Sequence, residues 1–130
     1  MKSELITNMY NSARERSISL FTMVSLKDPF VRDENFLKFN SFAAQFANAR
    51  MKLLKTSLSD NEQILLNKQG QLTSITAPIQ NQIAELVQLD RVKQANELLI
   101  EKAIPLQNDI LDLLKQLQII QHQSSQKIAT

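Results

Sequence analysis

Glycine and proline are so scarce in this chain that it can form only a few, long elements. The 130 residues include one Gly and three Pro, and neither Asn-Gly nor Asp-Gly occurs. A β-rich domain of this size needs such residues at its many tight turns. Leu, Ala, Gln, Lys and Glu, which favour helices, outnumber the β-branched residues. The sequence therefore predicts an all-α protein.

Apolar residues recur at three- and four-residue steps in four segments, which predicts helices at about 2–27, 31–58, 60–88 and 90–125. Pro29 ends the first segment, because the residue before a proline avoids the α region. Ser59 and Glu62 have the spacing of a capping box at the start of the third. Asp90 is expected to be the N-cap of the fourth.

The predicted helices contain some residues that are unusual on an apolar face or inside a helix. The third segment gives a stripe of Leu65, Lys68, Leu72, Ile75, Ile79, Ile83 and Leu86. Pro78 and Pro105 lie inside the third and fourth segments, where each removes a backbone hydrogen bond and is expected to kink its helix. Five phenylalanines fall close together and are expected to pack in the core or to form a dimer face: Phe30, Phe36, Phe39, Phe42 and Phe46.

The connections between these segments are short, so neighbouring helices must run antiparallel. The expected architecture is one domain, residues 1–130, folded as an up-down-up-down four-helix bundle with helices about 40–50 Å long. An even number of antiparallel helices places both ends of the domain at the same end of the bundle.

Composition argues against several classes of function. The net charge is +2 and the basic residues are spread along the chain, unlike the basic patch of a nucleic-acid-binding protein. The chain has no Cys, and its only histidine, His122, lacks the Glu three residues earlier that di-iron bundles use. No catalytic motif occurs either. We therefore expect no enzyme activity, no metal and no cofactor.

Arginine is the residue type most suggestive of binding. Arg50 interrupts the apolar seam of the second segment, and a buried guanidinium needs a carboxylate, a polar network or a bound anion. Glu15 and Asp33 are candidate partners within the chain. Recognition of a small anionic ligand between helices, where arginine makes bidentate contacts, is the other interpretation.

Three stretches resemble the four-helix-bundle extracytoplasmic sensor domains of bacterial chemoreceptors and diguanylate cyclases. They are Ala13-Arg14-Glu15-Arg16-Ser17, Asp28-Pro29-Phe30-Val31-Arg32-Asp33-Glu34 and Ala49-Arg50. The resemblance implies a periplasmic domain of an inner-membrane receptor, held between two membrane helices that lie outside these residues. It also implies a homodimer that relays the binding of a small anionic ligand or a periplasmic protein to a cytoplasmic output module through helix shifts.

Chemoreceptor domains of this kind often use arginines near a dimer interface, so the resemblance nominates Arg14, Arg16 and Arg50 as ligand-binding residues. The chain itself has no run of about 18 apolar residues, so any contact with a membrane would be through flanking segments. The alternative interpretation is an autonomous cytosolic module for protein–protein interaction or scaffolding, which would show the same helical seams.

Overall fold

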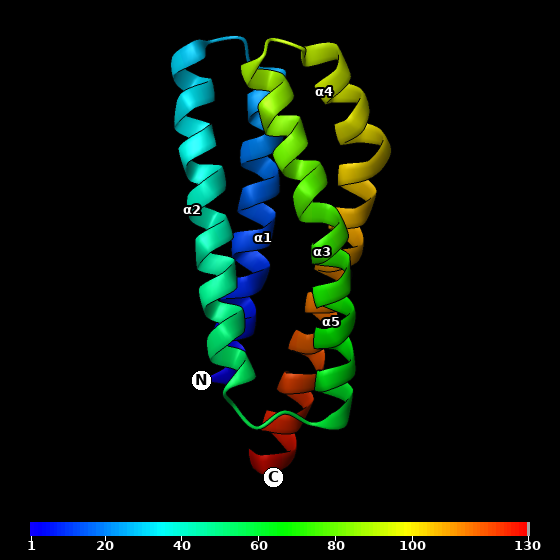
Figure 1. The fold of residues 1–130 in the computed structure, drawn as a ribbon. Coiled ribbons are helices and arrows are strands. Elements are labelled where there is room, and N and C mark those ends of the chain that lie inside the picture. Colours follow the sequence, from blue (N-terminus) through cyan, green and yellow to red (C-terminus); the bar gives the residue numbers. More distant parts are fainter. Residues whose placement is uncertain (130) are drawn as a thin grey trace.

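Four long antiparallel helical rods form the computed structural model of the chain (Figure 1). It describes the backbone of residues 1–129 and the side chains of residues 1–124. The first three rods are α1 (Lys2–Ser25), α2 (Pro29–Leu54) and α3 (Asp60–Gln88). The fourth is continuous and comprises α4 (Val92–Leu98), the π-helical turn η1 (Leu99–Ala103) and α5 (Ile104–Ala129). The predicted all-α, up-down-up-down bundle is confirmed, and residue 130 of the predicted domain lies outside the described residues.

The start of α1 and the end of α5 lie at the same end of the bundle (Figure 1). The rods pack unevenly: α1 and α2 stay close along most of their length, and α5 contacts both α1 and α3. The backbones of α2 and α3 approach each other much less closely. Within the described residues, no helix combines the length and the apolar character needed to cross a bilayer.

Local capping interactions define the helix starts. The Asp28 side chain accepts a hydrogen bond from the Phe30 N–H, and Pro29 occupies the first turn, where its missing N–H costs nothing. The capping box at Ser59 and Glu62 is confirmed. The prediction for Asp90 is wrong: its φ of 58° places it in the turn, and the N-cap position falls to Arg91, which makes no side-chain cap.

The second helix is shorter than predicted and ends at Leu54 rather than near residue 58. Thr56 donates both its backbone N–H and its hydroxyl to the Leu53 carbonyl, which closes the last turn. Leu58 then leaves the helix and packs against the core from the connection. Apolar periodicity places this residue in the helix, whereas in the structure it is half-buried from the connection.

The apolar core is divided into two clusters along the bundle axis. The cluster at the end with the termini contains Ile6, Met9, Ala13, Ala49, Leu53, Leu65, Leu66, Ile110, Leu114 and Leu117. The cluster at the opposite end contains Leu20, Met23, Val24, Phe39, Ile83, Ala84, Val87, Ala95, Leu99 and Ala103. Four buried polar side chains, Gln69, Thr76, Gln80 and Gln107, fall between these clusters in the sequence of α3 and α5.

The buried face of α3 differs from the predicted stripe. Lys68 and Ile75, which were expected to be buried, are exposed. Gln69, Thr76 and Gln80 are buried in their place. Gln69 contacts Arg50 of α2, and Gln80 contacts Arg16 of α1 and Gln107 of α5. The centre of the molecule is therefore more polar than the periodicity of large apolar residues indicated.

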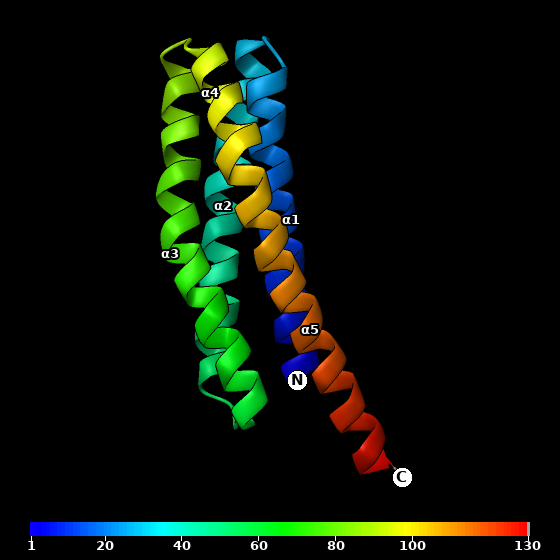
Figure 2. The same cartoon turned by 90° about the vertical axis from the view of Figure 1, so that its right-hand side faces the viewer.

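Both prolines predicted to kink their helices lie at irregular points. Pro78 lies inside α3, and Figure 2 shows this helix bending near its middle. Pro105 is the second residue after η1, and the Ile104 N–H at the end of this turn donates to the Leu99 carbonyl five residues earlier. A proline cannot donate the next backbone bond in an α-helix. The extra residue in the π-helical turn is thus located where proline disturbs the regular ladder.

Glu62 connects the start of α1 to the start of α3 through an ion pair. Its carboxylate accepts from the Ser59 N–H at 2.9 Å and from Lys2 Nζ at 3.0 Å, while Lys2 Nζ also donates to the Ser57 carbonyl at 2.6 Å. Burial acts to raise the pKa of Glu62, but the hydrogen bonds and charge of these partners outweigh it and hold the pKa below its usual value.

We expect Glu62→Gln to lower the free energy of unfolding by about 1–2 kcal/mol at pH 7, because it removes the ionised half of the capping box and the Lys2 ion pair. A carboxyl whose pKa is lower in the folded state stabilises above its unfolded pKa, and this contribution is lost as the pH falls through the folded value. Urea unfolding at pH 7 and in acid measures both effects. Glu4→Gln, at an exposed position on α1, is the matched control; an equal loss in both variants would contradict the assignment.

Candidate functional site

The polar middle of the bundle is organised around Arg16 of α1. Its Nη1 donates to Gln80 Oε1 at 2.5 Å, and its Nη2 donates to Asn81 Oδ1 at 3.1 Å. The guanidinium carbon lies 4.0 Å from the centre of the Phe39 ring, which is a cation–π distance. Arg16 therefore crosses from α1 to α3 and rests on an aromatic side chain of α2.

The charge of Arg16 is not balanced by a carboxylate. None of the ion pairs formed by the described side chains includes it. Its Nε is buried and has no hydrogen-bond partner. Burial lowers the pKa of Arg16 to about 10, which still leaves it charged at neutral pH. Because desolvating a charge without a counter-ion is costly, the half-buried guanidinium of Arg16 would be stabilised by an anion.

A chain of amides connects Arg16 with the other helices. Gln80 Nε2 donates to Gln107 Oε1 at 3.2 Å, and Gln107 Nε2 donates to the Ala13 carbonyl at 2.8 Å. The chain of bonds thus leaves α1 at Arg16, passes through α3 and α5, and returns to α1. A change in the position of the guanidinium would therefore alter hydrogen bonds that involve all three helices.

A cavity of about 330 Å³ adjoins this network. Arg16, Thr73, Thr76, Gln80, Asn81 and Gln107 supply its polar wall, and the apolar wall consists of Ala13, Ala43, Phe46, Ala47, Ala77 and Ile110. Ala47 of α2 and Asn81 of α3 are the exposed members, so the cavity opens between these two helices. Its size lies at the lower end of the range of small-molecule sites, about 300–1,000 Å³.

Arg50 has a different environment from Arg16. Its Nε donates to Gln69 Oε1 at 2.7 Å and its Nη2 donates to the Leu66 carbonyl at 3.2 Å. The expected ion pair with Glu15 or Asp33 is wrong, because those residues lie elsewhere and α3 supplies an amide and a backbone carbonyl instead. Arg50 thus bridges the gap between α2 and α3, and burial lowers its pKa.

Gly70 gives Arg50 the space to lie against α3. A Cβ atom at this position would come within 2.7 Å of Arg50 Nη2. We expect Gly70→Ala to stabilise the Arg50→Ala variant by about 1 kcal/mol, the usual gain of alanine over glycine in a helix. With Arg50 present this gain should disappear, because the methyl group displaces the guanidinium. A double-mutant cycle in urea measures the coupling, and equal effects of Gly70→Ala in both backgrounds would contradict it.

Arg14 is the third arginine that the sequence nominated. It is exposed, and its Nη2 lies 3.4 Å from Glu15 Oε1. The structure therefore does not bring the three nominated arginines together. Arg16 lines the cavity, Arg50 bridges α2 and α3 with its hydrogen bonds satisfied on α3, and Arg14 faces solvent.

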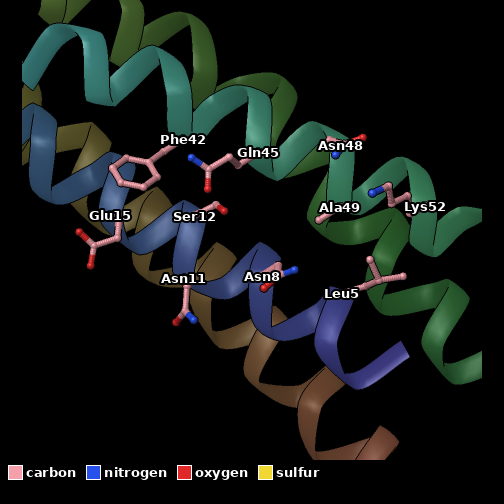
Figure 3. A pocket seen from close by; sticks show the side chains of 10 residues that line it. All are labelled: Leu5, Asn8, Asn11, Ser12, Glu15, Phe42, Gln45, Asn48, Ala49 and Lys52. Atoms are coloured by element: carbon pink, nitrogen blue, oxygen red, sulfur yellow. The ribbon is translucent and has the colours of Figure 1, made fainter. Parts of the chain in front are cut away.

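A second concavity lies on the outer side of the α1–α2 pair, and Figure 3 shows its side chains. Asn8, Asn11 and Glu15 of α1 line it together with Gln45 and Asn48 of α2. These side chains are exposed or half-buried, and Lys52 at its edge is exposed. Because water satisfies such groups, this groove lacks the desolvated charge that distinguishes the Arg16 cavity.

Sequence reasoning missed Gln80, Gln107 and Thr73 as site residues. A signal for the first was present, because Gln69, Thr73, Thr76 and Gln80 continue the three- and four-residue steps between Leu66 and Ile83. Reading only large apolar residues shifted the predicted stripe to the neighbouring face. Among the described side chains, no three His, Cys, Asp or Glu residues gather in a way that could hold a metal ion.

The fold and this central layer define a four-helix all-α bundle with a polar, charged interhelical cavity. Comparison of the chain with protein-family models, with curated proteins and with solved structures finds no match.

Proposed function

We propose that this bundle is the extracytoplasmic sensor domain of a bacterial transmembrane receptor. The observation that carries the proposal is the half-buried guanidinium of Arg16 at the middle of the bundle, whose Nε is buried without a hydrogen-bond partner and whose charge no carboxylate of the described residues pairs. Such a group destabilises an empty domain and favours a liganded one, which is the property that a sensor needs. Arg16 donates to Gln80 of α3, and Gln80 and Gln107 continue the network to α5 and back to α1, the two helices that contain the chain ends.

The proposed mechanism is a small shift of α1 against α3 and α5. An anion at Arg16 competes with Gln80 and Asn81 for the guanidinium, and Gln80 in turn is bonded to Gln107. Because side chains in a packed bundle adopt discrete arrangements, exchanging these partners moves helices by about 1–2 Å. Both chain ends lie at one end of the bundle, where membrane helices of a receptor would continue from them (Figure 1).

The coding sequence on both sides of residues 1–130 tests this function directly. Apolar runs of about 20 residues immediately before and after the domain are expected, and they would place it outside the cytoplasm of a membrane receptor. A reading frame that begins at Met1 and stops after Thr130 would contradict the proposal. Location is checked independently by the accessibility of the domain to protease in intact spheroplasts.

The second candidate function is an autonomous cytosolic interaction or scaffold module. The apolar side chains exposed on α1 and α2, which include Ile18, Phe21 and Leu37, favour contact with another protein. In the sensor proposal the same kind of surface would serve a homodimer, the commonest symmetric assembly. Sedimentation of the isolated domain measures self-association. Stable monomers combined with a reading frame that lacks membrane segments would favour the scaffold function.

A further inference from the structure

The chemistry of the cavity walls restricts the ligand. Arginine has five N–H donors, and Arg16 uses two of them, one each for Gln80 and Asn81. Thr73 accepts from Gln69 Nε2 at 2.7 Å, which leaves its hydroxyl hydrogen able to donate to a ligand. The polar wall thus has hydrogen-bond donors close to a single positive charge, an arrangement that can bind one anionic group.

The charge of the lining also excludes some ligands. Among the described side chains that line the cavity there is no Asp or Glu, and Arg16 is the only charged one. An ammonium group would find no counter-ion there, so amino acids and other zwitterions are disfavoured. A dianion would keep one charge unbalanced inside the bundle. A single negative charge matches the single guanidinium.

The remaining wall is apolar. Phe46 and Ile110, together with four alanines, line the part of the cavity away from the polar groups. An inorganic anion would leave this surface in contact with water, whereas an apolar body would cover it and gain about 25 cal/mol for each Å² buried. The cavity volume of about 330 Å³ limits that body to a small one.

We propose that the cavity binds a small monocarboxylate with a compact apolar body. The carboxylate accepts hydrogen bonds from Arg16, where the planar guanidinium suits its two oxygens. The apolar body lies between α2 and α3, against Phe46 and Ile110. This assignment names the ligand class of the proposed sensor and rests on that function for its biological role.

Calorimetric titration of the 130-residue domain tests the assignment, with sodium butyrate and sodium benzoate as probes at constant ionic strength. Inorganic phosphate and alanine are the comparison compounds. We expect saturable binding of the carboxylates with a dissociation constant of about 1 mM or below, and binding of phosphate and alanine at least tenfold weaker. Equal binding of phosphate would overturn the need for an apolar body, and absence of carboxylate binding would overturn the assignment.

Three variants distinguish the site from general effects. Arg16→Lys keeps the charge but loses the planar fork, so carboxylate binding should weaken at least tenfold. Ala47→Leu should abolish binding by filling the opening, and since Ala47 is exposed the fold should be retained. Arg14→Gln, two residues from Arg16, should bind as the unchanged protein does. Binding that persists in Ala47→Leu, or that is lost in Arg14→Gln, would contradict the location.

Failure of this assignment differs from failure of the sensor function. Flanking membrane segments without carboxylate binding would overturn the ligand class and support the sensor. Binding at Arg16 in a chain without membrane segments would support the ligand class and overturn the sensor.

Discussion

Phe39→Ala is expected to lower the free energy of unfolding by about 4 kcal/mol, in the usual range of 3–5 kcal/mol for a buried phenylalanine. The Phe39 side chain is 1% exposed and belongs to the cluster far from the termini. Its removal leaves a cavity in that cluster and takes away the ring on which Arg16 rests. Urea unfolding followed by circular dichroism measures the loss.

Two further variants separate the contributions at this position. Phe30→Ala is the matched control, because Phe30 is 84% exposed and its removal should change stability by less than about 0.5 kcal/mol. Phe39→Leu keeps most of the apolar volume but removes the aromatic face. It should therefore lower the free energy of unfolding less than Phe39→Ala does, while still removing the ring on which Arg16 rests. A Phe39→Ala loss no larger than that of Phe30→Ala would contradict the described core.

The opposite effect is expected when the central polar layer is made apolar. The triple variant Arg16→Met, Gln80→Leu, Gln107→Leu should raise the free energy of unfolding by about 3 kcal/mol or more. Fully burying one leucine side chain contributes about 1.5–3 kcal/mol, and the cost of burying an unpaired charge is removed as well. The three side chains must change together, since a single substitution would leave its hydrogen-bond partners unsatisfied.

This second prediction measures the cost of the proposed site. A sensor that keeps a charged cavity in its core gives up stability for binding, as functional sites often do. The triple variant should lose carboxylate binding completely while its urea midpoint rises. The exposed substitutions Asn8→Leu and Asn11→Leu are the control for added apolar residues and should leave stability nearly unchanged. A lower urea midpoint in the triple variant would mean that the polar layer stabilises the fold and would argue against a binding role.

The π-helical turn corresponds to a spacing of small and polar residues in the sequence. Ala95, Leu99, Ala103 and Gln107 are buried at three successive four-residue steps. A regular α-helix has 3.6 residues per turn, so residues four apart drift gradually around its surface. They stay on the core side only if the helix contains an extra residue, as a π-helical turn does. The turn η1 contains this extra residue. Alanine and glutamine are weak markers of a core. The sequence predicts one helix over about residues 90–125 with a kink at Pro105, and the π-helical turn is found only in the structure.

The sequence by itself determined the helices and their order. The scarcity of Gly, the break at Pro29 and the capping box at Ser59 act through local backbone chemistry, which neighbouring residues supply. Short connections then forced the antiparallel arrangement and brought the chain ends to one end of the bundle. These features depend on residues close together in the chain, so reading the sequence was sufficient for them.

Only the tertiary structure decided which polar residues are buried and what they contact. Gln80 and Gln107 are 27 residues apart and meet because α3 and α5 pack side by side. Arg50 looked like a charge in need of a carboxylate, yet it bonds to an amide and a backbone carbonyl beside Gly70. Whether a polar side chain on a helix faces water or a neighbouring helix depends on the spacing between the rods. That spacing is set by the packing of all four rods together, and the periodicity of one helix does not contain it.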